Sequence, residues 1–236
     1  MIDDVEDLRM HNDSRPSRCE KEAMRQVMKV ENKNKIVAHL SDYNNINERD
    51  NFTLLEMTPH HMLLNYSMKL GALGKVNPPI RSKEIMAGNF QAYLDGKLDI
   101  LSSDHAPHTE YDKEEFSSAK SGIPGVETRV PLMLALVAEK IVPLNVLVKT
   151  AAEKPAEKFG LKKGKIETGY IADFVCVKFS NAVKINEERL HSKNPATPFN
   201  GFRAIFPERV ILRGNDIISG KEIIDDRTGS YISSDK

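Results

Sequence analysis

Cysteine is scarce in this chain of 236 residues, which contains only Cys19 and Cys176, far apart in the sequence. Two cysteines cannot build the disulfide framework of a small secreted domain or a cysteine-rich zinc finger. We therefore expect a protein of a reducing compartment. Residues 1–7 are acidic, where a secretory signal would be basic and then apolar, so we expect no targeting segment and a cytoplasmic protein.

Neither a charge surplus nor a long hydrophobic run is present. Lys and Arg total 34, as do Asp and Glu, so the formal net charge is zero. A dedicated nucleic-acid-binding protein needs a basic excess. The longest apolar run, residues 130–138, is far shorter than the ~20 residues that span a bilayer. We expect no nucleic-acid or membrane partner, and a buried helix at this run.

Hydrophobic residues make up 40% of the chain and charged residues 29%, which is typical of a globular protein with a sizeable core. Up to about residue 160, short apolar runs alternate with segments of helical periodicity, which indicates parallel strand–helix units. After Gly160, glycines punctuate short apolar runs, which is typical of antiparallel strands. We expect helices near 13–28, 83–94, 128–139, 144–152 and 156–159, strands at 35–40, 52–57, 98–102, 173–177 and 209–212, and a loop at 42–51.

Histidines gather where the first three expected strands end. His39 lies near the end of the first, His60 and His61 follow the second, and two more histidines follow the third, so five of the seven histidines are at these ends. A single histidine in such a place is more often a satisfied core residue than a ligand. Because catalytic groups gather at the carboxyl ends of barrel strands, the clustering indicates one shared pocket.

Asp104 is the most specific of these residues. It directly follows an apolar strand and precedes two histidines and a proline. A carboxylate there can bind a metal ion and accept a proton from water. It can equally cap a helix or a turn. Spacing alone leaves both interpretations open.

The chain resembles the dihydroorotase family of the amidohydrolase superfamily. The signature D-H-A-P-H-T stands at residues 104–109, and further motifs follow the family's order along the whole chain. They are H…R-P…E at 11–20, A-H-L-S at 38–41, E-M-T-P-H-H at 56–61, K-V-N-P-P-I-R at 75–81, G-I-P-G-V-E-T at 122–128, G-K-I-E-T-G-Y-I-A-D at 164–173 and N-P-A-T-P-F-N-G at 194–201.

The resemblance implies an α/β fold: the last three strands of a TIM-type (β/α)8 barrel in residues 1–160, and a small C-terminal β-domain segment in 161–236. It implies interconversion of dihydroorotate and N-carbamoyl-aspartate in pyrimidine biosynthesis, usually with zinc. By the family pattern, Asp104 is the catalytic proton carrier. His39 and Asp104 bind metal, and the substrate-binding residues are Asn77, His108, Ser121 and Gly122.

The family's H-x-H pair does not occur in these 236 residues. Of six family metal positions, the chain retains His39 and Asp104. A catalytic zinc takes about three protein ligands, so we expect this chain alone to hold no zinc tightly and to be inactive. We expect His60 and His61 to form pocket wall, without converging on the point that His39 and Asp104 face.

Two other functions stay open. One is a cyclic amidohydrolase of the allantoinase or hydantoinase type, against which residues 75–79, with Asn77, favour dihydroorotase. The other is a non-catalytic partner of a full-length homologue. A three-strand piece of a barrel leaves unpaired strand edges. We therefore expect self-association, or pairing with an N-terminal half.

Overall fold

The structure, a computed structural model, describes residues 7–30, 35–51, 53–220, 222–224 and 229–233. The fold divides into two compact units. The first comprises the residues up to Arg129 together with Ile185–Gly201, and the second comprises Val130–Lys184 and the residues from Phe202 onward. The expected domain boundary after residue 160 stays a prediction.

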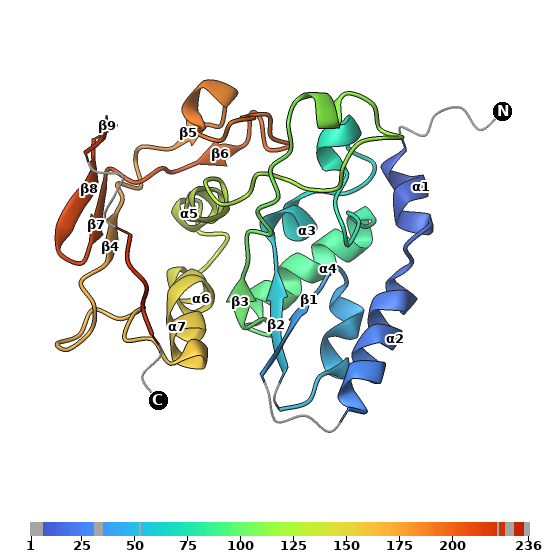
Figure 1. Ribbon diagram of the computed structural model, residues 1–236, viewed down its shortest axis with the longest axis horizontal. Helices are drawn as coiled ribbons and strands as arrows, with labels where there is room; N and C mark the ends of the chain where they lie inside the picture. Colours follow the sequence, from blue (N-terminus) through green and yellow to red (C-terminus); the bar gives the residue numbers. More distant parts are fainter. Residues whose placement is uncertain (1–6, 31–34, 52, 221, 225–228, 234–236) are drawn as a thin grey trace. The chain divides into compact units, whose positions relative to one another are not determined.

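A parallel sheet of three strands forms the centre of the first unit (Figure 1). Its strands are β1 (Ile36–His39), β2 (Thr53–Met57) and β3 (Ile100–Leu101), with β2 in the middle. The register pairs His39 with Glu56 and Met57 with Leu101. Because the strands are parallel, their carboxyl ends lie at one edge. The three expected strands are confirmed here, each shorter than the sequence indicates, and Phe52 lies outside the described residues.

The helices of the first unit differ from expectation at its start. Two short helices, α1 (Leu8–Asp13) and α2 (Ser17–Met28), replace the single helix expected from Asp13. Asp13 ends α1, and the extended Pro16 occupies the N-cap position of α2.

Two helices link the strands. α3 (Pro59–Leu63) begins just after β2, with Pro59 in its first turn. It packs against α4 (Lys83–Leu94), whose bounds match the expected helix. Ser82 caps α4, since its hydroxyl accepts a hydrogen bond from the Ile85 N–H at 3.3 Å. This is the ordinary role of serine before a helix.

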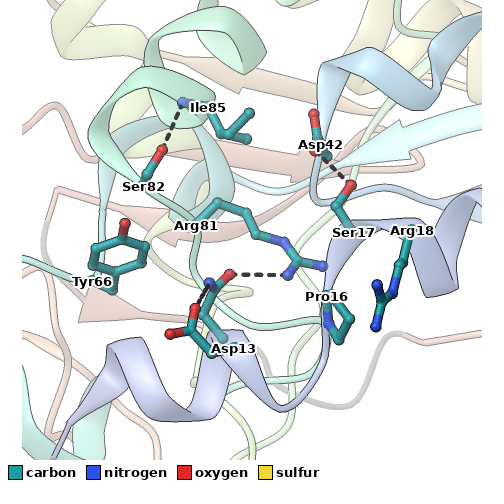
Figure 2. A pocket seen from close by; sticks show the side chains of 10 residues that line it. Asp13, Pro16, Ser17, Arg18, Asp42, Tyr66, Arg81, Ser82 and Ile85 are labelled. Atoms are coloured by element: carbon teal, nitrogen blue, oxygen red, sulfur yellow. Dashed lines mark hydrogen bonds between the residues drawn. The ribbon is translucent and has the colours of Figure 1, made fainter.

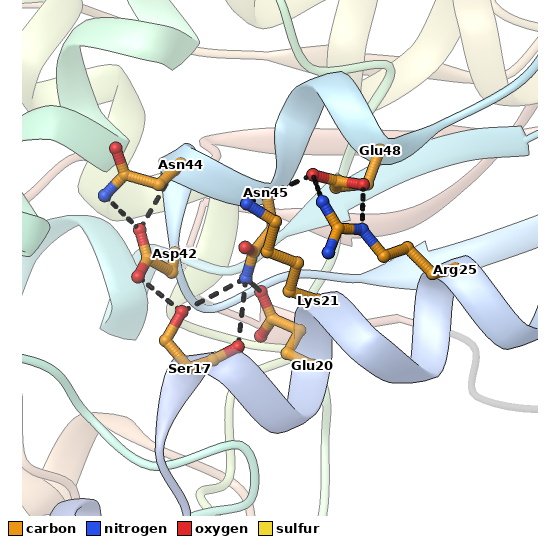
Figure 3. A network of polar contacts seen from close by, with 8 residues as sticks. All are labelled: Ser17, Glu20, Lys21, Arg25, Asp42, Asn44, Asn45 and Glu48. Atoms are coloured by element: carbon orange, nitrogen blue, oxygen red, sulfur yellow. Dashed lines mark hydrogen bonds and ion pairs between the residues drawn. The ribbon is translucent and has the colours of Figure 1, made fainter.

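The segment expected as a loop at 42–51 contains a 3-10 helix, η1 (Tyr43–Glu48). Asp42 caps it by accepting the Asn44 N–H at 2.9 Å, and Ile46 is buried. Figure 3 shows how Asn45 reaches back to α2, donating to the Glu20 carboxylate at 2.7 Å. Tertiary contacts thus hold a helical turn that asparagine-rich sequence does not favour. Further 3-10 turns are η2 (Gly71–Gly74), η3 (Tyr111–Lys113) and η5 (Glu187–Arg189).

The second unit combines helices with antiparallel strands. From Val130 onward it includes most of α5 (Arg129–Ala138), in which Leu132 and Met133 are at most 2% exposed, so the expected buried helix is confirmed. One sheet has the order β4-β7-β8-β9, and β5 pairs with β6. The second unit also contains the following helices and strands: α6 (Leu144–Val148), the π-helix η4 (Lys149–Glu153), α7 (Lys154–Phe159), β4 (Phe174–Cys176), β5 (Val183–Lys184), β6 (Arg203–Ala204), β7 (Arg209–Leu212), β8 (Asn215–Ser219) and β9 (Glu222–Ile223).

The structure bears on two expectations from the sequence, one about the cysteines and one about membrane-spanning helices. Cys19 and Cys176 are both free and exposed. No helix in the described part of the chain has the length and apolar character needed to cross a membrane.

Candidate metal centre

His39 is the last residue of β1 and is held by its partner across the strand pair. Its Nδ1 lies 2.7 Å from Oε1 of Glu56. A carboxylate at Nδ1 accepts a hydrogen bond from the N–H there, which leaves the lone pair of Nε2 free for a ligand. The Nε2 atom is buried and has no hydrogen-bond partner among the described residues. This is how metal-binding histidines are usually presented.

His60 and His61 enter the same region from α3. The Thr58 hydroxyl donates to Nδ1 of His61 at 2.9 Å, and Nε2 of His61 donates to the Pro78 carbonyl at 3.0 Å. Nε2 of His60 is buried without a partner in the described part of the chain. The rings of His60 and His61 lie 4.5 Å apart between centroids.

The three histidines form one group. Each offers one nitrogen, and these nitrogens lie within 4.8 Å of one another. His60 and His61 therefore do converge with His39, which their expected role as pocket wall did not anticipate, whereas a meeting point that includes Asp104 stays untested. The reason is that α3 starts directly after β2, so its first turn lies beside the end of β1. Strand-end clustering signalled a shared pocket, but it did not show that these side chains face each other.

Burial keeps two of these imidazoles neutral. Desolvation, reinforced by the nearby His61 and His39, holds the pKa of His60 well below its usual value. Desolvation likewise lowers the pKa of His61 to about 3. Only a neutral imidazole has a lone pair to give to a metal, so both side chains are in a ligand-competent form at neutral pH.

Asn89 of α4 fixes the backbone around the histidines. Its side chain is fully buried. Nδ2 donates to the carbonyls of Ser41 and His61, both at 2.9 Å, and Oδ1 accepts the Tyr43 N–H at 2.7 Å. One amide thus ties the chain just beyond β1 to α3. Because buried polar groups without partners are costly, this geometry is strongly held.

A cavity of about 430 Å³ is lined by residues of α1, α2 and the start of α4 and of the segments next to them (Figure 2). Arg81, which is 5% exposed, lines it. Its guanidinium donates to the Ser41 hydroxyl at 2.9 Å and to the Arg15 carbonyl at 2.6 Å. Arg18, Asp13 and Asp42 also line the cavity, so its charges balance.

Asp104 lies just after β3 in a left-handed conformation, with φ of 44°. Side chains other than glycine adopt this region rarely, and such strain is often found at functional sites. Asp104 is not a member of the histidine group, which was the one group of three or more possible ligands in the described residues. Its metal-binding and catalytic roles stay predictions.

Three of the four expected substrate residues lie together. Nε2 of His108 donates to the Ser121 carbonyl at 3.0 Å. A Cβ at Gly122 would lie 2.8 Å from that same Nε2 and 2.4 Å from the Ala106 carbonyl oxygen, so the site requires glycine. A cavity of about 470 Å³ includes His108 in its lining.

Asn77, the fourth, is exposed and belongs to the adjoining loop. The Gly122 N–H donates to the Lys75 carbonyl at 3.0 Å, two residues before Asn77. Asn194 was not predicted as a site residue, yet its Nδ2 donates a hydrogen bond to the His108 carbonyl at 2.9 Å. The motif at 194–201 marked its neighbourhood but not this contact.

Comparison with known proteins places the chain in a family. The sequence pattern of the amidohydrolase family matches residues 82–215, more than half of the chain. The chain belongs to the amidohydrolase family. This amidohydrolase chain is 54% identical, over 97% of its length, to the dihydroorotase of Thermoplasma volcanium, and 56% identical, over 95%, to that of Thermoplasma acidophilum. The resemblance to dihydroorotases is therefore confirmed.

Solved structures agree on the fold of this amidohydrolase. A D-hydantoinase (dihydropyrimidinase) from Thermus sp. matches 91% of the chain with a TM-score of 0.82 and 25% identity. The chain spans about half the length of the proteins it matches, with 54% of the Thermoplasma volcanium relative and 52% of the Thermus structure covered.

Proposed function

We propose that this chain contributes to a dihydroorotase, which interconverts dihydroorotate and N-carbamoyl-aspartate. Identity of 54–56% to proteins named dihydroorotase carries this proposal. Hydantoinases resemble the chain in fold at about 25% identity, so the hydantoinase alternative is weaker. The loop that carries Asn77 supports the same choice, since it belongs to the dihydroorotase motif of residues 75–81.

We also propose that the parallel sheet is part of a TIM-type barrel. Three parallel strands, each followed by helical or turn structure, suit one sector of such a barrel. In this sector β1 is an edge strand, and Val37 on it is 40% exposed. The edge suits pairing with further strands, either from a second copy of the chain or from an N-terminal half.

The residues at the strand ends fit a metal ion. The fit rests on the buried Nε2 of His39, which lacks a partner among the described residues while Glu56 holds Nδ1. His39 and Asp104 would hold the metal, by the family pattern, and zinc is the ion that the family usually carries. A bound zinc lowers the pKa of water and polarises a carbonyl group.

The remaining chemistry belongs to the chain's own side chains. Asp104 would accept a proton from the attacking water and pass it to the ring amide nitrogen as the bond from that nitrogen to the attacked carbonyl carbon breaks; the nitrogen stays in the product as part of its carbamoyl group. Asn77, His108 and the backbone at Ser121 and Gly122 would hold the substrate. The bond from His108 to Ser121 fixes the ring of the histidine, so the group is oriented before substrate arrives.

The test combines this chain with the amino-terminal half of the Thermoplasma acidophilum relative and follows the ring opening of dihydroorotate. Asp104→Ala should abolish turnover, whereas Asn77→Ala should mainly raise KM. Asp95→Asn, an exposed carboxylate at the end of α4, is the matched control and should leave activity unchanged. If Asp104→Ala keeps most of its kcat, the assigned role is wrong.

A further inference from the structure

We propose that His39, His60 and His61 form a metal-binding site of their own, in which His60 is a ligand that the family pattern does not assign. The site would take a borderline divalent cation such as zinc or cobalt. This inference deepens the proposed function, because both use His39. It departs from the expectation that the chain alone holds no zinc tightly.

The strongest support is the pair of unsatisfied nitrogens. Nε2 of His39 and Nε2 of His60 are both buried, and neither has a hydrogen-bond partner within the described residues. A buried polar atom without a hydrogen-bond partner is rare, and coordination of an ion is one arrangement that satisfies it. Two such atoms in one group of three histidines point to the same ion.

The distances suit a single small ion after a modest adjustment. The three ligand nitrogens lie within 4.8 Å of one another. Around a tetrahedral zinc, with Zn–N bonds of about 2.0–2.1 Å, ligand nitrogens are roughly 3.3 Å apart. Small rotations of the imidazole rings therefore bring them to bonding distance. Neutral imidazole nitrogen suits zinc, cobalt, nickel and copper, whereas magnesium and calcium prefer oxygen.

The three histidines differ in how easily each can coordinate a metal ion. Glu56 already orients His39, and His60 has its Nε2 free of hydrogen bonds. His61 has both ring nitrogens engaged, with Thr58 and with Pro78, so it must release one bond to coordinate. We therefore assign His39 and His60 as the primary ligands and His61 as the third.

The experiment is a titration of the metal-stripped 236-residue chain with Co²⁺, followed by its visible absorption, and then displacement by Zn²⁺. We expect one saturable site per chain with the intense absorption of a four-coordinate cobalt. His60→Gln and His39→Gln should each weaken binding at least tenfold. His191→Gln removes a histidine whose side chain is 68% exposed and should change nothing.

If His60→Gln fails to fold, one spectroscopic measurement and one further variant still test the proposed site. Nitrogen-15 spectra of the unaltered protein should show the ring nitrogens of three histidines shifting together as zinc is added. Glu56→Gln should weaken binding about 10- to 100-fold, because it removes the partner that orients His39.

The outcomes separate this site from the proposed function. Absence of saturable binding in the unaltered chain, or loss of binding in His191→Gln alone, overturns the histidine site. Equal losses in His39→Gln and Asp104→Asn, with His60→Gln unchanged, overturn it as well, while they leave the family ligand pair and the proposed activity standing.

Discussion

Asn89→Ala tests whether one buried amide holds the candidate metal centre together. The side chain makes three hydrogen bonds of 2.7–2.9 Å, all to backbone groups, and it is fully buried. Its removal leaves one N–H and two carbonyls without this partner. At about 1–2 kcal/mol for each group, we expect the free energy of unfolding to fall by about 3–6 kcal/mol.

Urea denaturation at pH 7, followed by circular dichroism, measures this loss. Gln91→Ala is the matched control, because it removes an exposed amide from the same helix, one that bonds only to Asp95 at 2.8 Å as far as the described contacts go. The control should lose less than about 1 kcal/mol. A loss of the same small size in Asn89→Ala would refute the argument that this amide fastens β1 to α3.

Three other predictions concern a glycine in the fold, the pH dependence of stability and self-association. Gly122→Ala should destabilise the chain by about 1–3 kcal/mol in urea, because its Cβ would press on the Ala106 carbonyl; Gly229→Ala, with open space around it, should have little effect. In metal-free protein, the free energy of unfolding should be highest above pH 6.5 and should fall toward about pH 3, because the folded-state pKa of His61 is lowered to about 3 and unfolding takes up a proton in this range. His61 alone contributes a slope of about 1.4 kcal/mol per pH unit. A free energy of unfolding that does not change between pH 5 and 6.5 would contradict this prediction. Light scattering should show concentration-dependent self-association through the edge of β1, and a sharp, concentration-independent monomer would exclude it.

The sequence predicted elements best where local signals and tertiary structure agree. Helix α4 appears with its expected bounds because Ser82 caps it. The 3-10 helix η1 was not predicted, since its asparagines disfavour helix, and contacts with Glu20 and Asn89 stabilise it instead. Such contacts join residues 25 and 46 positions apart, and no local pattern reports them.

The same limit applies to the site. The pattern of apolar runs in the sequence predicted that His39, His60 and His61 lie at strand ends, and this was sufficient to predict a shared pocket. It could not show that the group of three nitrogens forms within 4.8 Å, because that depends on how α3 turns after β2. Asp104 illustrates the converse, since its motif is specific while its φ of 44° could not be read from the sequence.

The register of β1 and β2 has a consequence for insertions and deletions. His39 and Glu56 are direct partners across the two strands, and their side chains meet at 2.7 Å. An extra residue in the exposed stretch at 49–51 leaves that pairing intact, so homologues can differ in length there. An extra residue between Thr53 and Glu56 turns the carboxylate to the opposite face of the sheet. Length variation among homologues should therefore be found between the strands and not within β2.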